Sequence, residues 1–158
     1  MSKLLLVQFD LHQRLYHNAL DGFTDNETNQ RPHGNPNMNH VKYLTGHLLN
    51  SQYGLAMIAG LEPEVKWNDF FAVMGQSEAK DNISYPSIEE IKWEWDALYK
   101  PTRKGLSELS DDDLENPHQS LSGMSQIPAE NFGRLLTIIK PTTSGRSALL
   151  EKYLVKNR

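Results

Sequence analysis

The sequence contains no cysteine, and this absence removes several kinds of site at once. Without cysteine there is no disulfide framework, no thiolate metal site and no cysteine nucleophile. The apolar run near the start, residues 4–7, is far shorter than the core of a signal peptide. No stretch approaches the roughly 20 apolar residues that a membrane-spanning helix needs. We therefore expect a cytoplasmic protein with no membrane partner.

Positive charge is also scarce. The 158 residues carry 16 Lys and Arg against 20 Asp and Glu, a formal net charge of -4. No cluster of basic residues forms a face for phosphate, so we expect no nucleic-acid partner. The sequence also lacks a phosphate-binding glycine loop, a nucleophile–base pair and paired carboxylates placed for acid–base chemistry. Motifs of these kinds therefore do not indicate which reaction, if any, the protein catalyses.

The apolar residues recur with helical periodicity along the whole chain, which has the length of one domain, residues 1–158. The first predicted helix ends before Gly22. One face of it carries apolar residues spaced by three or four, namely Leu4, Val7, Leu11, Leu15 and Ala19. Residues 23–38 are rich in Asn, Asp, Pro and Gly, and this composition predicts a loop.

Three further helices are predicted. The second runs from about residue 39 to 59, and an irregular segment over 61–86 holds one short helical turn near 68–74. The third starts with a capping box, Ser87 and Glu90, and should kink or end at Pro101. The fourth starts near residue 128 and keeps its apolar period to the C-terminus, although Pro141 and Gly145 interrupt it.

The candidate metal ligand is His47. The chain has six histidines, and they are the only soft ligands it offers. On a helical wheel His47 lies at the flank of the apolar stripe of the second helix, with Tyr43 and Asn50 nearby. His40 shares its face but lies about 10 Å away along the axis, too far to bind the same ion. The alternative is a partly buried histidine with only a structural role, because a single histidine makes no site.

The segment Asn39–Leu49, with its Gly46-His47-Leu48 step, resembles the second helix of the DinB-like superfamily. Residues 9–27 resemble the first helix of that family and the turn after it, and the ending Leu149–Leu154 resembles its C-terminus. The likeness covers nearly the whole chain. It depends more on the order and spacing of the motifs than on any one of them.

This resemblance implies an all-α fold, a four-helix bundle of the DinB/YfiT type that is often a homodimer. It implies a divalent metal, Zn or Ni, held by three histidines at one end of the bundle, with His47 as the first ligand and Tyr43, Asn50 and His12 around the pocket. An open coordination position of such a metal can activate water or a thiol. Some relatives transfer low-molecular-weight thiols or isomerise thiol adducts, and others are described as hydrolases.

The last helix departs from the family. The other two histidines should form a His-x-x-x-His pair, and counting back from Leu149 places that pair at Ile139 and Thr143. Neither residue is a useful zinc ligand. The resemblance therefore implies an incomplete metal site, with weak or no binding of metal.

A change of reading frame could explain this departure. If the third base of each codon over residues 137–148 is read with the first two bases of the next, synonymous codons exist that spell His-His-Lys-Ala-Tyr-His-Ile-Gly-Gln-Ile-Gly. That is the missing motif, with histidines at positions 139 and 143. We therefore hypothesise a pair of compensating frameshifts in the gene or in its recorded sequence. The alternative is a natural lineage that lost its metal and evolved a kinked last helix.

Two functions from different classes remain open. One is metal-dependent chemistry on an unknown small molecule, thiol transfer or hydrolysis, with the site incomplete in this chain. The other is a metal-free stress-response or binding module that is not an enzyme.

Overall fold

A computed structural model describes residues 2–72, 76–110 and 112–113 of the chain. This part is built of helices and contains no strand, which confirms the prediction of an all-α fold. None of its helices is both long enough and apolar enough to cross a bilayer. The predicted fourth helix, from about residue 128, lies outside the described residues.

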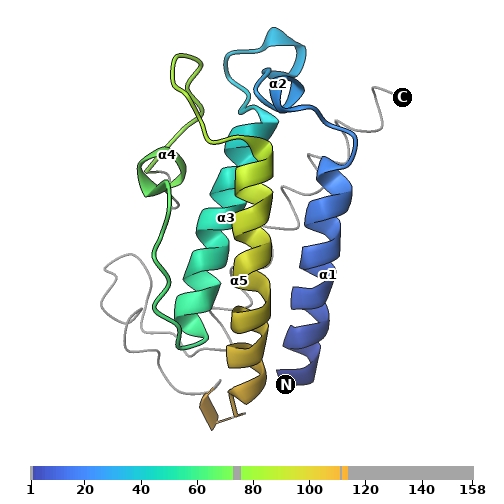
Figure 1. Ribbon diagram of the computed structural model, residues 1–158, viewed down its shortest axis with the longest axis vertical. Coiled ribbons are helices and arrows are strands. Elements are labelled where there is room, and N and C mark those ends of the chain that lie inside the picture. The colour runs from blue at the N-terminus through green and yellow to red at the C-terminus, as the bar shows by residue number, and fades with distance from the viewer. Residues whose placement is uncertain (1, 73–75, 111, 114–158) are drawn as a thin grey trace.

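Three long helices run side by side (Figure 1). They are α1 (Ser2–Leu20), α3 (Val41–Ile58) and α5 (Ile88–Glu108), and α5 packs against both of the others. In Figure 1, α1 runs upward and α3 runs back down, whereas α5 again starts at the top. Residues 59–87 therefore return the chain along the length of α3, and they carry the short helix α4 (Asn68–Phe71).

Local signals set the ends of these helices. The Ser87 hydroxyl accepts from the backbone of Glu90 and the Glu90 carboxylate accepts from the backbone of Ser87, so the predicted capping box is present. His40 begins α3, because its Nδ1 accepts from the backbone N–H of Tyr43 at 3.0 Å. Gly22 (φ 79°) and Gly60 (φ 83°) end the first two long helices in the left-handed conformation that favours glycine.

Two predictions about local structure are wrong. The predicted loop over 23–38 contains a capped helical turn, α2 (Asp25–Thr28), and a 3-10 turn, η1 (Pro32–Gly34). Helix α5 continues through Pro101, where we predicted a kink or an end. Pro101 is exposed, so its ring meets no neighbouring helix, and the missing N–H costs the helix one hydrogen bond on the solvent side.

The core lies between α5 and its two neighbours. Tyr16 of α1 stacks on Trp95 of α5 with ring centroids 3.8 Å apart, and Phe9 stacks on Tyr99 at 5.5 Å. Helix α3 is buried on almost every side. Its end meets α5 closely, because a Cβ on Gly105 would fall 2.5 Å from the carbonyl oxygen of Ala59.

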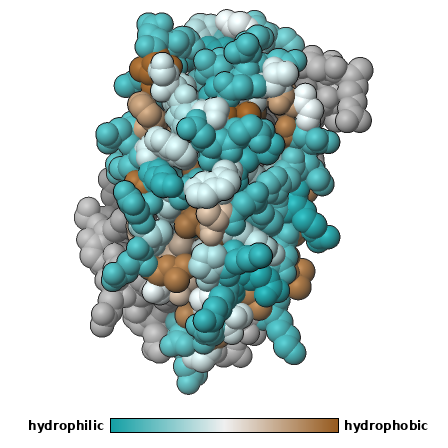
Figure 2. Space-filling view, viewed as in Figure 1, coloured by the Kyte–Doolittle hydropathy of each residue, from teal (hydrophilic) through white to brown (hydrophobic). Residues whose placement is uncertain are grey.

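The first half of the predicted apolar face of α1 is exposed, and other residues of α1 meet α5. Leu4, Val7 and Leu11 are exposed, and the exposed fractions of Leu4 and Val7 are 60% and 62%. Phe9 and Tyr16 are instead buried against α5. The face drawn in Figure 2 is mostly hydrophilic, with apolar residues in small separate patches.

Candidate functional site

The candidate ligand His47 lies inside the protein. Only 7% of its surface is exposed, and its Nδ1 atom is buried. The ring of Tyr43, one helical turn earlier on α3, stacks on it with centroids 5.7 Å apart and an interplanar angle of 24°. Both side chains therefore project from one face of α3, as the spacing of four residues predicts. The role of His47 as a metal ligand stays a prediction.

Tyr43 joins this face of α3 to the segment that follows α4. Its hydroxyl donates to the carbonyl oxygen of Ser77 at 2.6 Å and lies 2.9 Å from the Ser77 hydroxyl. The Ser77 hydroxyl in turn donates to the carbonyl oxygen of Ala72. The phenol oxygen is thus already engaged by the backbone, and the Tyr43 ring rather than its hydroxyl faces His47.

Asn50, one turn beyond His47, is also held in place. It is buried, and its Nδ2 donates to the Oδ1 of Asn68, the first residue of α4, at 3.0 Å. This bond orients the amide and uses part of its hydrogen-bonding capacity. Tyr43 and Asn50 therefore flank His47 along α3, and their role as pocket residues stays a prediction.

Helix α4 covers this face of α3, and the sequence analysis missed it as part of the site. Phe71 of α4 is 1% exposed and lies against Gly46, the residue before His47. A glycine in the middle of a predicted helix can indicate such a close approach, because it costs stability unless something needs the space. The partner of that glycine, 25 residues later, has no comparable signal.

Of the other predicted site residues, one lies on α1 and two lie outside the described residues. His12 lies on α1 and is half-buried, so its place in the pocket stays a prediction. The vacated ligand positions, Ile139 and Thr143, lie outside the described residues. So does the segment 137–148, to which the reading-frame hypothesis applies.

The remaining described histidines have other surroundings. His17 lies 2.7 Å from the carboxylate of Asp96 on α5, and His33 is exposed in η1. His40 is fully buried. Burial lowers the pKa of His40 from its usual value and the nearby Arg31 acts in the same direction, while the backbone of Lys80 opposes them.

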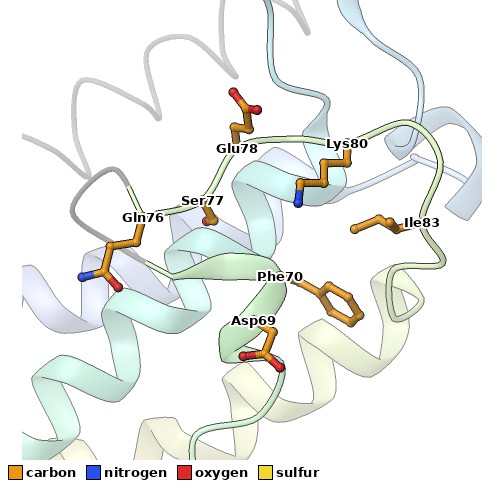
Figure 3. A pocket seen from close by; sticks show the side chains of 7 residues that line it. All are labelled: Asp69, Phe70, Gln76, Ser77, Glu78, Lys80 and Ile83. Atoms are coloured by element: carbon orange, nitrogen blue, oxygen red, sulfur yellow. The ribbon is translucent and has the colours of Figure 1, made fainter.

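A cavity of about 540 Å³ lies beside this group, between α4 and residues 76–83. Ser77, the partner of Tyr43, is one of its lining residues. In Figure 3 the side chains of Phe70, Lys80 and Ile83 extend toward one another, and Glu78 points away from them. The full lining is Asp69, Phe70, Gln76, Ser77, Glu78, Lys80 and Ile83. Such a wall, charged on one part and apolar on another, suits a small polar molecule.

The described residues do not form a complete metal centre. Among residues 2–72, 76–110 and 112–113, no three histidine or acidic side chains lie close enough together to hold an ion. His47 supplies one imidazole on its face of α3, and its neighbours there are a phenol and an amide with partners of their own.

Comparison with known protein families shows to which family the chain belongs. The model of the DinB superfamily matches residues 8–139. The chain belongs to the DinB superfamily. The match includes all of α3 and α5 and most of α1, and it ends at residue 139, the first of the two vacated positions. No curated protein matches the chain.

Proposed function

We propose that this DinB protein has, beside α3 and α4, a pocket arranged for metal-dependent chemistry on a small molecule, and that the metal site of this pocket is incomplete. The observation that carries the proposal is the burial of His47 beside the stacked ring of Tyr43, which is the environment of a ligand or pocket residue rather than of a solvated histidine. The sequence adds that Ile139 and Thr143 stand where the DinB pattern has histidines.

The donor set that the described residues offer does not fit a divalent metal. Zinc sites in proteins use three or four nitrogen, sulfur or oxygen ligands, and one imidazole alone falls short of that number. The neighbouring Tyr43 hydroxyl and Asn50 amide are neutral groups that already make hydrogen bonds. We therefore expect weak or no binding of Zn or Ni and assign no catalytic step to a metal in this chain.

Elemental analysis of the purified protein tests this proposal. We expect far less than one equivalent of zinc or nickel per chain. The double substitution Ile139→His/Thr143→His should restore stoichiometric zinc binding, and the further change His47→Ala should abolish it again. Stoichiometric zinc in the unaltered protein that is lost on His47→Ala would contradict the incomplete site. If the double variant binds zinc equally well with and without His47→Ala, His47 is not a ligand of the site.

A metal-free binding module is the second candidate function. It is supported by the cavity beside α4, whose lining residues include no member of the predicted ligand set. The two candidates differ in one respect: the double histidine variant should acquire hydrolytic or thiol-transfer activity only if the pocket is arranged for metal chemistry. We also propose a homodimer, which light scattering on the purified protein will test.

A further inference from the structure

A second pocket, on the side of the molecule formed by α5 and the segment before α4, contains a buried carboxylate. The cavity measures about 430 Å³ and is lined by Lys66, Trp67, Glu89, Glu90, Trp93 and Glu94. None of these residues belongs to the His47 group. The side chain of Glu94 is buried, which is unusual for a carboxylate and requires compensation by hydrogen bonds or a cation.

Glu94 obtains this compensation from two groups. Its Oε1 accepts from the Tyr53 hydroxyl of α3 at 2.7 Å, and its Oε2 accepts from the ammonium of Lys66 at 2.6 Å. The same ammonium lies over the indole ring of Trp93, 5.3 Å from its centroid. The protein thus already holds one alkylammonium group between a carboxylate and an aromatic face, which is the combination that recognises organic cations.

The two tryptophans of this pocket are each unusual in one respect, Trp93 in its exposure and Trp67 in its backbone conformation. Trp93 is 66% exposed, the largest exposure among the large apolar side chains of the described residues. Trp67 has φ 56° and ψ 28°, a left-handed conformation that is strained for a bulky residue. Backbone strain of this kind persists where the surrounding structure holds it, often at ligand sites.

The charge of the lining selects the sign of the ligand. Three carboxylates face one ammonium, so an anion would be repelled and a cation attracted. Glu89 already pairs with Lys92, and Glu90 caps α5, so Glu94 is the buried carboxylate that a ligand would approach. Lys66, which holds it now, is half-buried and comes from residues 61–67, where the chain forms neither helix nor strand.

From this geometry we propose that the pocket binds a small organic ammonium compound. The charged head of the ligand lies against Glu94 and the indole of Trp93, and Lys66 is an internal competitor for the same position. This inference does not depend on the metal site, because the two groups of residues do not overlap.

Tetramethylammonium chloride is the probe, with sodium chloride at equal ionic strength as the reference. Saturation-transfer NMR of the probe methyl groups should show saturable binding with a dissociation constant in the millimolar range. Trp93→Ala should weaken binding about two- to fivefold, because an exposed cation–π contact contributes about 0.5–1 kcal/mol. The control is Val7→Ala, at an exposed apolar residue of α1 that does not line the pocket, and it should leave the dissociation constant of the probe unchanged.

The Lys66 variants test the competition. Lys66→Gln removes the internal ammonium and should tighten binding severalfold, whereas Lys66→Arg keeps a cation and should leave binding as it is. Circular dichroism checks that each variant is folded. Absence of saturable binding to the unaltered protein, equal binding by Trp93→Ala, or equal or weaker binding by folded Lys66→Gln would each overturn the proposal.

Discussion

Gly46 and Phe71 are in such close contact that no side chain fits between them. A Cβ on Gly46 would fall 2.3 Å from the Cζ atom of Phe71. Phe71 cannot move aside easily, because it is buried and packs against the rings of Tyr43 and Tyr85. The contact therefore fixes α4 against α3 one residue before His47.

Gly46→Ala should destabilise the protein by about 1–3 kcal/mol, because the added methyl overpacks this contact. Gly54→Ala is the matched control. It lies on the same helix with no atom within 4 Å of the added Cβ, so it should stabilise by about 0.5–1 kcal/mol through helix propensity. Urea unfolding monitored by circular dichroism measures both. Equal effects of the two substitutions would show that α4 moves away from the added methyl group without a loss of stability.

Deleting the hydroxyls of two tyrosines should have different effects on the free energy of unfolding. Tyr43→Phe removes the bond to the Ser77 carbonyl and should cost about 0.5–1.5 kcal/mol. The hydroxyl of Tyr16 is buried with no hydrogen-bond partner at the described residues, so Tyr16→Phe should be neutral or stabilising. The midpoints of chemical denaturation report both free energies. A loss of stability in Tyr16→Phe as large as that in Tyr43→Phe would contradict these assignments.

The buried His40 should make the protein less stable as the pH falls. Its pKa in the folded state lies below the value of about 6.5 in an unfolded chain. Between the two pKa values the unfolded state binds more protons, so the free energy of unfolding rises with pH there and is lost as the pH drops below about 6.5. His40→Asn, which retains a capping acceptor, should flatten this dependence.

His33→Asn is the control for that experiment, because His33 is exposed and asparagine tolerates its positive φ. Its denaturation midpoints between pH 5 and 7, a window about the usual histidine pKa, should follow those of the unaltered protein. A flattened profile in His33→Asn and an unaltered one in His40→Asn would refute the assignment to His40.

The reading-frame hypothesis predicts a specific DNA sequence. The codons for residues 137–148 should carry bases that, one position out of frame, encode histidines at 139 and 143. Sequencing the gene from its source checks this. If no single-base shift restores the motif, natural loss of the metal ligands is the explanation that remains.

The sequence predicted helices well where the determinants are local. The capping box of Ser87 and Glu90 and the stop at Gly60 depend on residues within one turn, and both are present. Which face of α1 packs against α5 depends on more than local residues. Helix α1 carries apolar residues on more than one face, and periodicity alone does not tell whether Leu4 or Phe9 meets α5.

The surroundings of the site were predictable only along α3. Tyr43 and Asn50 follow from helical spacing around His47, whereas Ser77 and Asn68 come from the irregular segment between α3 and α5. Contacts of that kind depend on how a loop folds back over a helix, and no periodic pattern encodes them. The pocket around Glu94 was missed for the same reason, because Lys66 and Trp93 lie 27 positions apart.

Pro101 lies inside α5 and interrupts its hydrogen bonding. Since it has no N–H to give the carbonyl of Ala97, the ladder of hydrogen bonds is interrupted once, between the turns that hold Trp95 and those that hold Leu106. Fluctuations that unwind the end of the helix meet a natural boundary there. Amide protons after Pro101 should therefore exchange with deuterium faster than those in the turns before it.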